Sequence, residues 1–108
     1  MFNIFSSDTK AYKSLTGRDF KEEFNKSKHS VLIDVRTAAE FAAGTLPGAK
    51  NIDIISPNFQ AKISALDKSK EYFIFCRSGS RSAQACNIMA DQGYSVYNLK
   101  GGVNAWPQ

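Results

Sequence analysis

The sequence predicts an α/β protein in which helices cover both faces of a mainly parallel β-sheet. Short continuous apolar runs, which mark strands buried on both faces, alternate along the chain with segments of helical periodicity. The chain has 108 residues, of which 43% are hydrophobic. A chain of this size can bury a core without disulfides or a structural metal, so we expect one domain over residues 1–108.

The first strand and helix are expected within residues 11–28. "AYKSL" (11–15) is typical of a weak strand, and "TGRDFKEEFNKSK" is typical of a helix. Thr16 is followed three residues later by Asp19, which is the signature of a capping box at a helix start.

The second strand and helix follow directly. "SVLIDV" (30–35) is a β-branched apolar run, which predicts a strand buried on both faces. Thr37 and Glu40 form a second capping-box pattern, and Gly44 predicts the end of the helix.

The second half of the chain continues the alternation. The expected elements are a short strand over 49–54, a helix over 56–70 with Pro57 in its first turn, a buried strand over 72–76, a helix that begins near Arg81 and that Gly93 ends, a strand over 95–99, and a turn into a short terminal helix.

Cys76 stands where the strand "YFIFC" ends. In open parallel sheets, ligands bind beyond the carboxyl ends of the strands. We therefore expect Cys76 at the binding edge, with Asp34 and Arg36 at the end of a neighbouring strand.

The residues after Cys76 favour an anion cradle around its sulfur. Gly79 permits a positive φ, and the small side chains of Ser78 and Ser80 leave the backbone amides uncovered. A helix that begins near Arg81 supplies further free N–H groups and a partial positive charge. Such surroundings lower the pKa of a cysteine, so a reactive thiolate is predicted.

Arginines flank this loop, and a catalytic base is missing from it. Arg77 and Arg81 stand on either side of Gly79, and guanidinium groups suit oxyanions. The only histidine, His29, precedes a strand and is expected at the opposite end of the sheet, which argues against a Cys–His dyad. The loop therefore suits a thiolate that attacks sulfur without help from a general base.

Other residues have structural interpretations. Asp34 and Arg36 are expected to form a local salt bridge or a contact with Glu40 at the helix start, with contact to the substrate as the alternative. Cys86 lies among apolar helix residues and is expected in the core, with a redox partnership to Cys76 as the alternative. The glycines at 101–102 predict a tight turn.

Several classes of function are disfavoured by the composition. The net charge of +4 comes from scattered lysines without interleaved aromatics, so a nucleic-acid partner is not expected. No apolar run is long enough for a membrane helix. The N-terminal "MFNIFSSDTK" is unlike a signal peptide, so we expect a cytoplasmic protein. Two cysteines and one histidine cannot form the usual structural zinc site.

Three segments together resemble the rhodanese family, specifically its small single-domain sulfurtransferases. These are "VLIDVRTAAEFAAGTLPGAKNI" (31–52), "FIFCRSGSRS" (73–82) and "GYSVYNLKGGVNAW" (93–106). The resemblance implies a rhodanese-like α/β fold around a five-stranded, mainly parallel sheet. One departure is Thr45, which stands where many members have a histidine outside the catalytic loop.

The resemblance also implies roles for the loop. Cys76 would carry a persulfide, and the backbone amides of residues 77–81 (Arg77, Ser78, Gly79, Ser80 and Arg81) would hold its outer sulfur. Arg77 and Arg81 would bind a small anionic sulfur donor such as thiosulfate. A thiol or a protein cysteine would accept the sulfur. No cofactor or metal is expected, and we expect a monomer or a weak homodimer.

Thiosulfate sulfurtransferase activity is therefore the leading hypothesis, and three alternatives stay open. The chain could be a persulfide carrier in a protein sulfur relay. It could be a phosphatase or arsenate reductase, although those loops resemble Cys-x5-Arg and Arg81 follows Cys76 after only four residues. It could serve for protein interaction alone, although an intact cysteine in an intact cradle argues against this.

Overall fold

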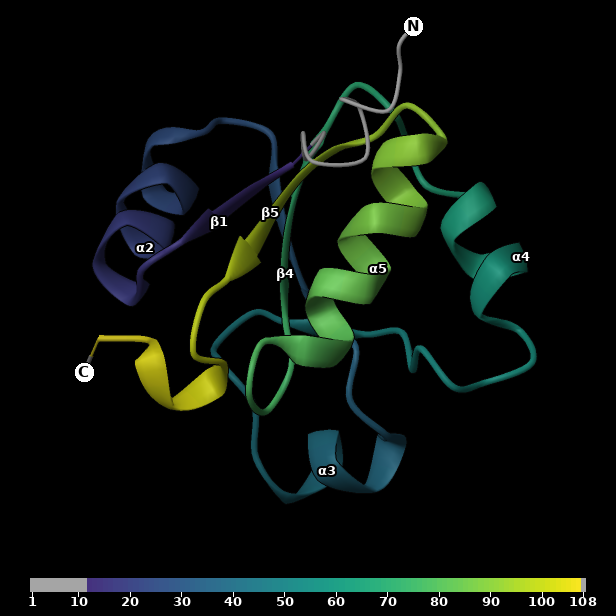
Figure 1. Ribbon diagram of the computed structural model, residues 1–108, viewed down its shortest axis with the longest axis horizontal. Helices are drawn as coiled ribbons and strands as arrows, with labels where there is room; N and C mark the ends of the chain where they lie inside the picture. Colours follow the sequence, from purple (N-terminus) through teal and green to yellow (C-terminus); the bar gives the residue numbers. More distant parts are fainter. Residues whose placement is uncertain (1–11, 108) are drawn as a thin grey trace, which may run out of the picture.

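The fold is an α/β arrangement, seen in a computed structural model that describes residues 12–107 (Figure 1). Its elements are β1 (Lys13–Leu15), α2 (Gly17–Lys26), β2 (Ser30–Asp34), α3 (Ala38–Ala43), β3 (Lys50–Asn51), α4 (Phe59–Ser64), β4 (Glu71–Phe75), α5 (Ser80–Asp91), β5 (Ser95–Leu99) and the 3-10 helix η1 (Val103–Ala105). Ala11 of the first predicted strand, and the N-terminal segment 1–10, lie outside the described residues.

The five strands form one sheet in the order β1-β5-β4-β2-β3, and every neighbouring pair is parallel. The predicted fold class is thereby confirmed. β4 lies at the centre, between β2 and β5, with Asp34 beside Phe75 and Asn98 beside Ile74. The parallel arrangement brings the carboxyl ends of all five strands to one edge of the sheet.

Helices cover both faces of the sheet, as the continuous apolar strands predict. Successive side chains of β4 point to opposite faces. Tyr72, Ile74 and Cys76 belong to the core that α4 and α5 cover, whereas Phe73 and Phe75 belong to the core that α2 and η1 cover. Figure 1 shows α2 on one side of the strands and α5 with α4 on the other.

Both capping signals identified in the sequence mark helix starts, but only the second forms the complete capping box. The Thr16 hydroxyl accepts a hydrogen bond from the Asp19 amide at 3.3 Å and caps α2. At α3 the full capping box forms, because Thr37 and Glu40 each accept a hydrogen bond from the other's backbone amide. Glu40 is thereby held at the start of α3, close to the carboxyl edge of the sheet.

Two predicted elements are shorter in the structure. The helix expected over 56–70 is wrong in its bounds, since α4 covers Phe59–Ser64 and Pro57 lies in the turn before it. Ser56 Oγ accepts from the Asn58 amide just before this helix, and Asp67 Oδ1 accepts from the Ser69 amide beyond it, and both bonds favour turns.

The second shortened element is the strand expected over 49–54. Only Lys50–Asn51 is a strand, at the sheet edge beside β2.

None of the helices in the part of the chain that the structure describes combines the length and apolarity needed to cross a membrane.

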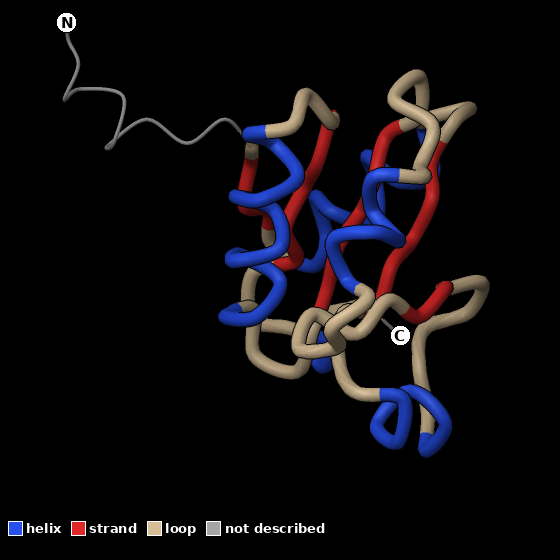
Figure 2. Tube along the Cα trace, turned by 90° about the vertical axis from the view of Figure 1, so that its right-hand side faces the viewer, coloured by secondary structure: helices blue, strands red, loops and turns tan. Residues whose placement is uncertain are grey.

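The carboxyl edge of the sheet gathers several segments that are far apart in the sequence. The loop after β4, the segment that leads into α3 and the turn between β5 and η1 all begin there. In both views α3 lies beyond this edge (Figures 1 and 2). The candidate functional residues lie in these segments.

Candidate active site around Cys76

Cys76 lies directly after β4, in the short loop that leads into α5. Gly79 is the N-cap of α5 and has a φ of 99°, in the left-handed region that glycine adopts without a steric penalty. This turn lets the first amides of α5 point back at the end of β4. The local sequence therefore places a cysteine and a helix N-terminus against each other.

The Cys76 sulfur receives a ring of hydrogen-bond donors. The Gly79 amide donates to Sγ at 3.1 Å and the Ser82 amide at 3.3 Å. Ser82 Oγ also lies 3.3 Å from the sulfur, as donor or acceptor. The side chain has no exposed surface. The sulfur is therefore shielded from solvent in this structure.

These donors favour the thiolate form of Cys76. Burial alone raises the pKa of the thiol, but the Ser82 hydroxyl and the amides of Ser82, Gly79 and Ser78 together hold it below its ordinary value of 9.0. The predicted direction of this shift is thus the direction found. The sulfur also belongs to the apolar core on the α5 face, so its negative charge depends on the amide ring.

A chain of polar contacts continues from Ser82 to the edge strand β1. The Ser82 hydroxyl donates to Asn98 Oδ1 at 2.5 Å, and Asn98 Nδ2 donates to Ser14 Oγ at 2.9 Å. The strand register explains this arrangement, since Asn98 pairs with both Ile74 and Ser14 and points to the same face as Cys76.

Arg81 is occupied by an ion pair. Its guanidinium donates to both carboxylate oxygens of Glu40, at 2.8 and 3.1 Å. These hydrogen bonds from Arg81, with further ones from Thr37, lower the pKa of Glu40 to about 2, and the same pair raises the pKa of Arg81. Both side chains are about one-third exposed. In this state the Arg81 guanidinium faces Glu40 and is not free for an anion.

Asp34 and Arg36 form a buried salt bridge, which is one of the two structural roles predicted for them. Arg36 Nη2 lies 2.7 Å from Asp34 Oδ2 and also donates to the Gly44 carbonyl at 2.6 Å. Thr45, at the position that departs from the family pattern, donates its hydroxyl to Asp34 Oδ2 at 2.9 Å. Glu40, the other partner predicted for this pair, is hydrogen-bonded to Arg81, and its negative charge also helps to raise the pKa of Arg36.

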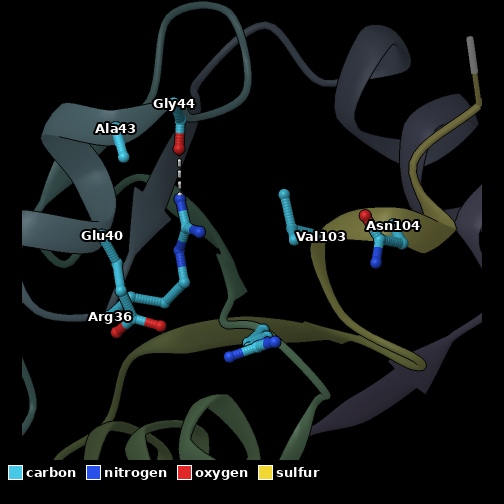
Figure 3. A pocket seen from close by; sticks show the side chains of 7 residues that line it. Arg36, Glu40, Ala43, Gly44, Val103 and Asn104 are labelled. Carbon is cyan, nitrogen blue, oxygen red and sulfur yellow. Dashed lines mark hydrogen bonds between the residues drawn. The ribbon is translucent and has the colours of Figure 1, made fainter.

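An open pocket of about 300 Å³ lies at this edge of the sheet. It is lined by Arg36, Glu40, Ala43, Gly44, Arg77, Val103 and Asn104. Figure 3 shows the residues from the α3 region on one side of the pocket and Val103 with Asn104 on the other. Arg36 and Glu40 are each neutralised by an ion pair, whereas Arg77 has no ion pair within residues 12–107. The pocket therefore carries the positive charge of Arg77.

The turn after β5 contacts the cysteine loop. The Val103 amide donates to the Cys76 carbonyl at 2.8 Å. Gly102 has a φ of 79°, and a Cβ built there would lie 1.9 Å from the Arg77 carbonyl oxygen. The two glycines at 101–102 thus form the expected turn, and they also permit a close approach to the cysteine loop that spacing alone did not indicate.

The predicted site residues are only partly brought together. Cys76 and Gly79 are in direct contact, and the Ser78 amide helps to lower the pKa of the thiol. Ser80 begins α5 and is exposed, while Arg77 faces the pocket.

Sequence reasoning missed Ser82, Asn98 and the partnership of Glu40 with Arg81. Placing the start of α5 at Ser80 would have indicated Ser82, because its amide is then among those that the helix leaves free. Asn98 is a polar residue between Tyr97 and Leu99 in a strand, and that is the signal that could have found it.

The second cysteine is structural. Cys86 is buried in the α5-side core, as predicted, and burial raises the pKa of its thiol well above the ordinary value. Both cysteines are free thiols. Within the described residues, no cluster of three or more His, Cys, Asp or Glu side chains is able to hold a metal ion.

Comparisons with known proteins agree on one family. The family model of the rhodanese-like domain matches residues 16–108. A protein named sulfurtransferase from Allochromatium vinosum is 42% identical over 78 residues, which cover 70% of each chain. The thiosulfate sulfurtransferase GlpE of Pseudomonas putida is 33% identical over 85 residues, which cover 78% of this chain and 76% of that protein. A crystal structure of a rhodanese-like domain protein from Staphylococcus aureus matches with a TM-score of 0.76 at 32% identity, over 89% of this chain and 92% of that chain.

Proposed function

This chain belongs to the rhodanese-like domain family, and on that premise we propose that it is a sulfurtransferase that works through a persulfide on Cys76. The donor is thiosulfate or a similar small anion that carries a sulfane sulfur. The acceptor is a thiophile, either a small thiol or a protein cysteine. The name of the Pseudomonas putida relative supports thiosulfate as the donor.

The observation that carries this proposal is the donor ring at the Cys76 sulfur. Two backbone amides and a hydroxyl surround Sγ, and the pKa of the thiol is lowered. The lowered pKa increases the share of thiolate, so the proposed attack does not depend on a general base. His29 is exposed and precedes β2, at the opposite end of the sheet, so it takes no part.

In the first step the Cys76 thiolate attacks the outer sulfur of thiosulfate. A bond forms between Sγ and that sulfur, the sulfur–sulfur bond of thiosulfate breaks, and its electron pair leaves with sulfite. The negative charge then lies on the outer sulfur of the persulfide. The amides of the loop residues that do not contact Sγ, including those of Arg77 and Ser80, are the candidates to hold it.

Arg77 is the candidate to attract the donor. It lines the pocket, it precedes the amide ring directly, and its guanidinium has no ion pair in the described part of the chain.

In the second step the acceptor attacks the outer sulfur, and the electron pair of the broken sulfur–sulfur bond returns to Sγ. With cyanide as acceptor the products are thiocyanate and the Cys76 thiolate.

Initial-rate kinetics test this proposal. Thiocyanate formation from thiosulfate and cyanide should give parallel double-reciprocal lines, the pattern of a two-step covalent mechanism. Cys76→Ser should abolish turnover, and Cys86→Ser is the matched control, since it changes the only other cysteine and should leave turnover intact. Turnover by the Cys76→Ser protein at the wild-type rate would refute the proposal.

A persulfide carrier is the second candidate function, and the Arg81–Glu40 pair favours it. Two free arginines would suit a small oxyanion, but only Arg77 is left without an ion pair among residues 12–107. A carrier would take its sulfur from a partner protein instead. Sulfur transfer from a cysteine desulfurase that greatly exceeds thiosulfate turnover would identify the carrier, and the reverse would identify the thiosulfate enzyme.

A further inference from the structure

The Ser82 hydroxyl has two partners but only one hydrogen. It lies 2.5 Å from Asn98 Oδ1 and 3.3 Å from the Cys76 sulfur. A carbonyl oxygen can only accept, so the hydroxyl must donate in order to bond Asn98. When it does so, it can offer the sulfur only a lone pair.

The orientation of the Asn98 amide is fixed by its other contacts. Nδ2 donates to the Gly79 carbonyl at 3.4 Å and to Ser14 Oγ at 2.9 Å. Because the Gly79 carbonyl can only accept, the nitrogen must face it and Oδ1 must face Ser82. Asn98 is 3% exposed, and within residues 12–107 Ser82 is the donor to Oδ1. Loss of the Ser82 hydrogen would therefore leave a buried acceptor unpaired, which is costly.

We propose that Asn98 is a positioning residue that competes with the Cys76 thiolate for the Ser82 hydroxyl hydrogen. In the protonated enzyme the thiol donates to Ser82 and Ser82 donates to Asn98, so every group is satisfied. In the thiolate the hydrogen turns to Sγ and Asn98 loses its donor. Asn98 thus restrains thiolate formation at the same site where the loop amides promote it.

The same competition gives a direction to the reaction cycle, and this consequence rests on the proposed sulfur transfer. Once Cys76 carries a second sulfur, the negative charge lies on the outer atom and Sγ no longer needs the hydroxyl. The Ser82 hydrogen then returns to Asn98. Asn98 therefore favours the sulfur-loaded enzyme over the free thiolate.

The test is the pH dependence of Cys76 alkylation by iodoacetamide, with the modified residue identified by mass spectrometry. The midpoint of the pH–rate profile reports the pKa of the thiol, whereas access to the buried sulfur changes only the maximum rate that the profile reaches at high pH. Asn98→Leu should lower this midpoint by up to about one pH unit, since a single hydrogen bond is worth about that much. General loosening of the loop would instead raise the midpoint toward the value of an ordinary thiol.

Two further variants show whether Asn98 acts through the hydroxyl. Ser82→Ala should raise the midpoint, and Asn98→Leu should add no shift in the Ser82→Ala background, because the contested hydrogen is gone. Ser14→Ala removes one of the two acceptors of Asn98 Nδ2 and serves as the matched control, with its midpoint unchanged. Should Asn98→Leu fail to fold, Asn98→Val suits a strand and makes the same test.

Two other titratable groups interact electrostatically with Cys76, and both hold their charge state over the pH range in which the Cys76 thiol titrates. Arg81 stays protonated because its pKa is raised, and Cys86 stays a neutral thiol because burial raises its pKa. An unchanged or raised midpoint in folded Asn98→Leu protein, or an equal downward shift without the Ser82 hydroxyl, would overturn this inference. Alkylation does not depend on sulfur transfer, so the result of this test is independent of whether the proposed function is correct.

Discussion

Arg81 in the first turn of α5 and Glu40 of α3 are joined by two hydrogen bonds across 41 residues of sequence. Glu40 is also bound by the Thr37 amide through the capping box of α3. One carboxylate therefore fixes the start of a helix and, at the same time, occupies the guanidinium that the loop sequence offers to an anion. The availability of Arg81 for a donor is thus set by a residue of another segment.

We expect Glu40→Gln to lower the KM for thiosulfate by roughly fivefold, because it removes one negative charge from the pocket and frees the Arg81 guanidinium. Glutamine keeps the capping box, so α3 should remain intact. Steady-state kinetics at low ionic strength measure the effect. Thr37→Ala is the control: it should cost about 1 kcal/mol of stability through the lost N-cap and leave KM unchanged. A higher KM in Glu40→Gln would show that the pair organises the donor site instead of obstructing it.

Glu40 should also contribute to stability in a pH-dependent manner. Its pKa is about 2 in the folded protein, against an ordinary value of 4.5, so folding favours the ionised form. The stabilisation is complete above pH 4.5 and is lost as the pH falls toward 2. Urea unfolding at a series of pH values should show the wild type and Glu40→Gln converging over this interval. A constant difference between the two proteins would contradict the shifted pKa.

The buried pair of Asp34 and Arg36 should be important for stability. Asp34 has no exposed surface and the Arg36 side chain is 9% exposed. Asp34→Asn leaves Arg36 as a buried charge without its counter-ion, which should cost about 3–5 kcal/mol in chemical denaturation. Glu22→Gln breaks the exposed pair with Arg18 and should cost no more than about 0.5 kcal/mol. Equal costs for the two variants would contradict the role given to burial.

Gly102 should be indispensable to the geometry of the cysteine loop. Gly102→Ala adds a Cβ that would lie 1.9 Å from the Arg77 carbonyl, so the loop must shift. We expect thiosulfate turnover to fall and the iodoacetamide midpoint of Cys76 to rise toward 9.0. Gly48→Ala is the control, because Gly48 has a similar φ of 82° but no atom within 4 Å of the added Cβ. Gly48→Ala should lose stability through backbone strain alone and should keep both its thiosulfate turnover and the iodoacetamide midpoint of Cys76.

The fold could be predicted because its signals are local and agree with one another. Continuous apolar strands such as Ser30–Asp34 and Glu71–Phe75 indicate burial on both faces, and the capping signals at Thr16 and Thr37 place helix starts correctly. The predicted bounds of α4 are too wide, because the hydroxyl of Ser56 and the carboxylate of Asp67 bond nearby amides and favour turns on either side of the helix.

The site could be predicted only as far as the loop itself. The position of Cys76 and the role of Gly79 follow from the spacing within the loop. The polar chain through Asn98 depends on strand register, and the occupation of Arg81 by Glu40 depends on how α3 packs beside α5. Such contacts join distant segments, and the composition of either segment alone does not determine them.

Intact mass spectrometry after treatment with thiosulfate tests the central claim most directly. The wild type and Cys86→Ser should each gain the mass of one sulfur atom, localised to Cys76 by peptide mapping and removed by cyanide. Cys76→Ser should gain nothing. A sulfur atom found on Cys86, or no gain in the wild type with either thiosulfate or a desulfurase as donor, would contradict a persulfide held by the amide ring at Cys76.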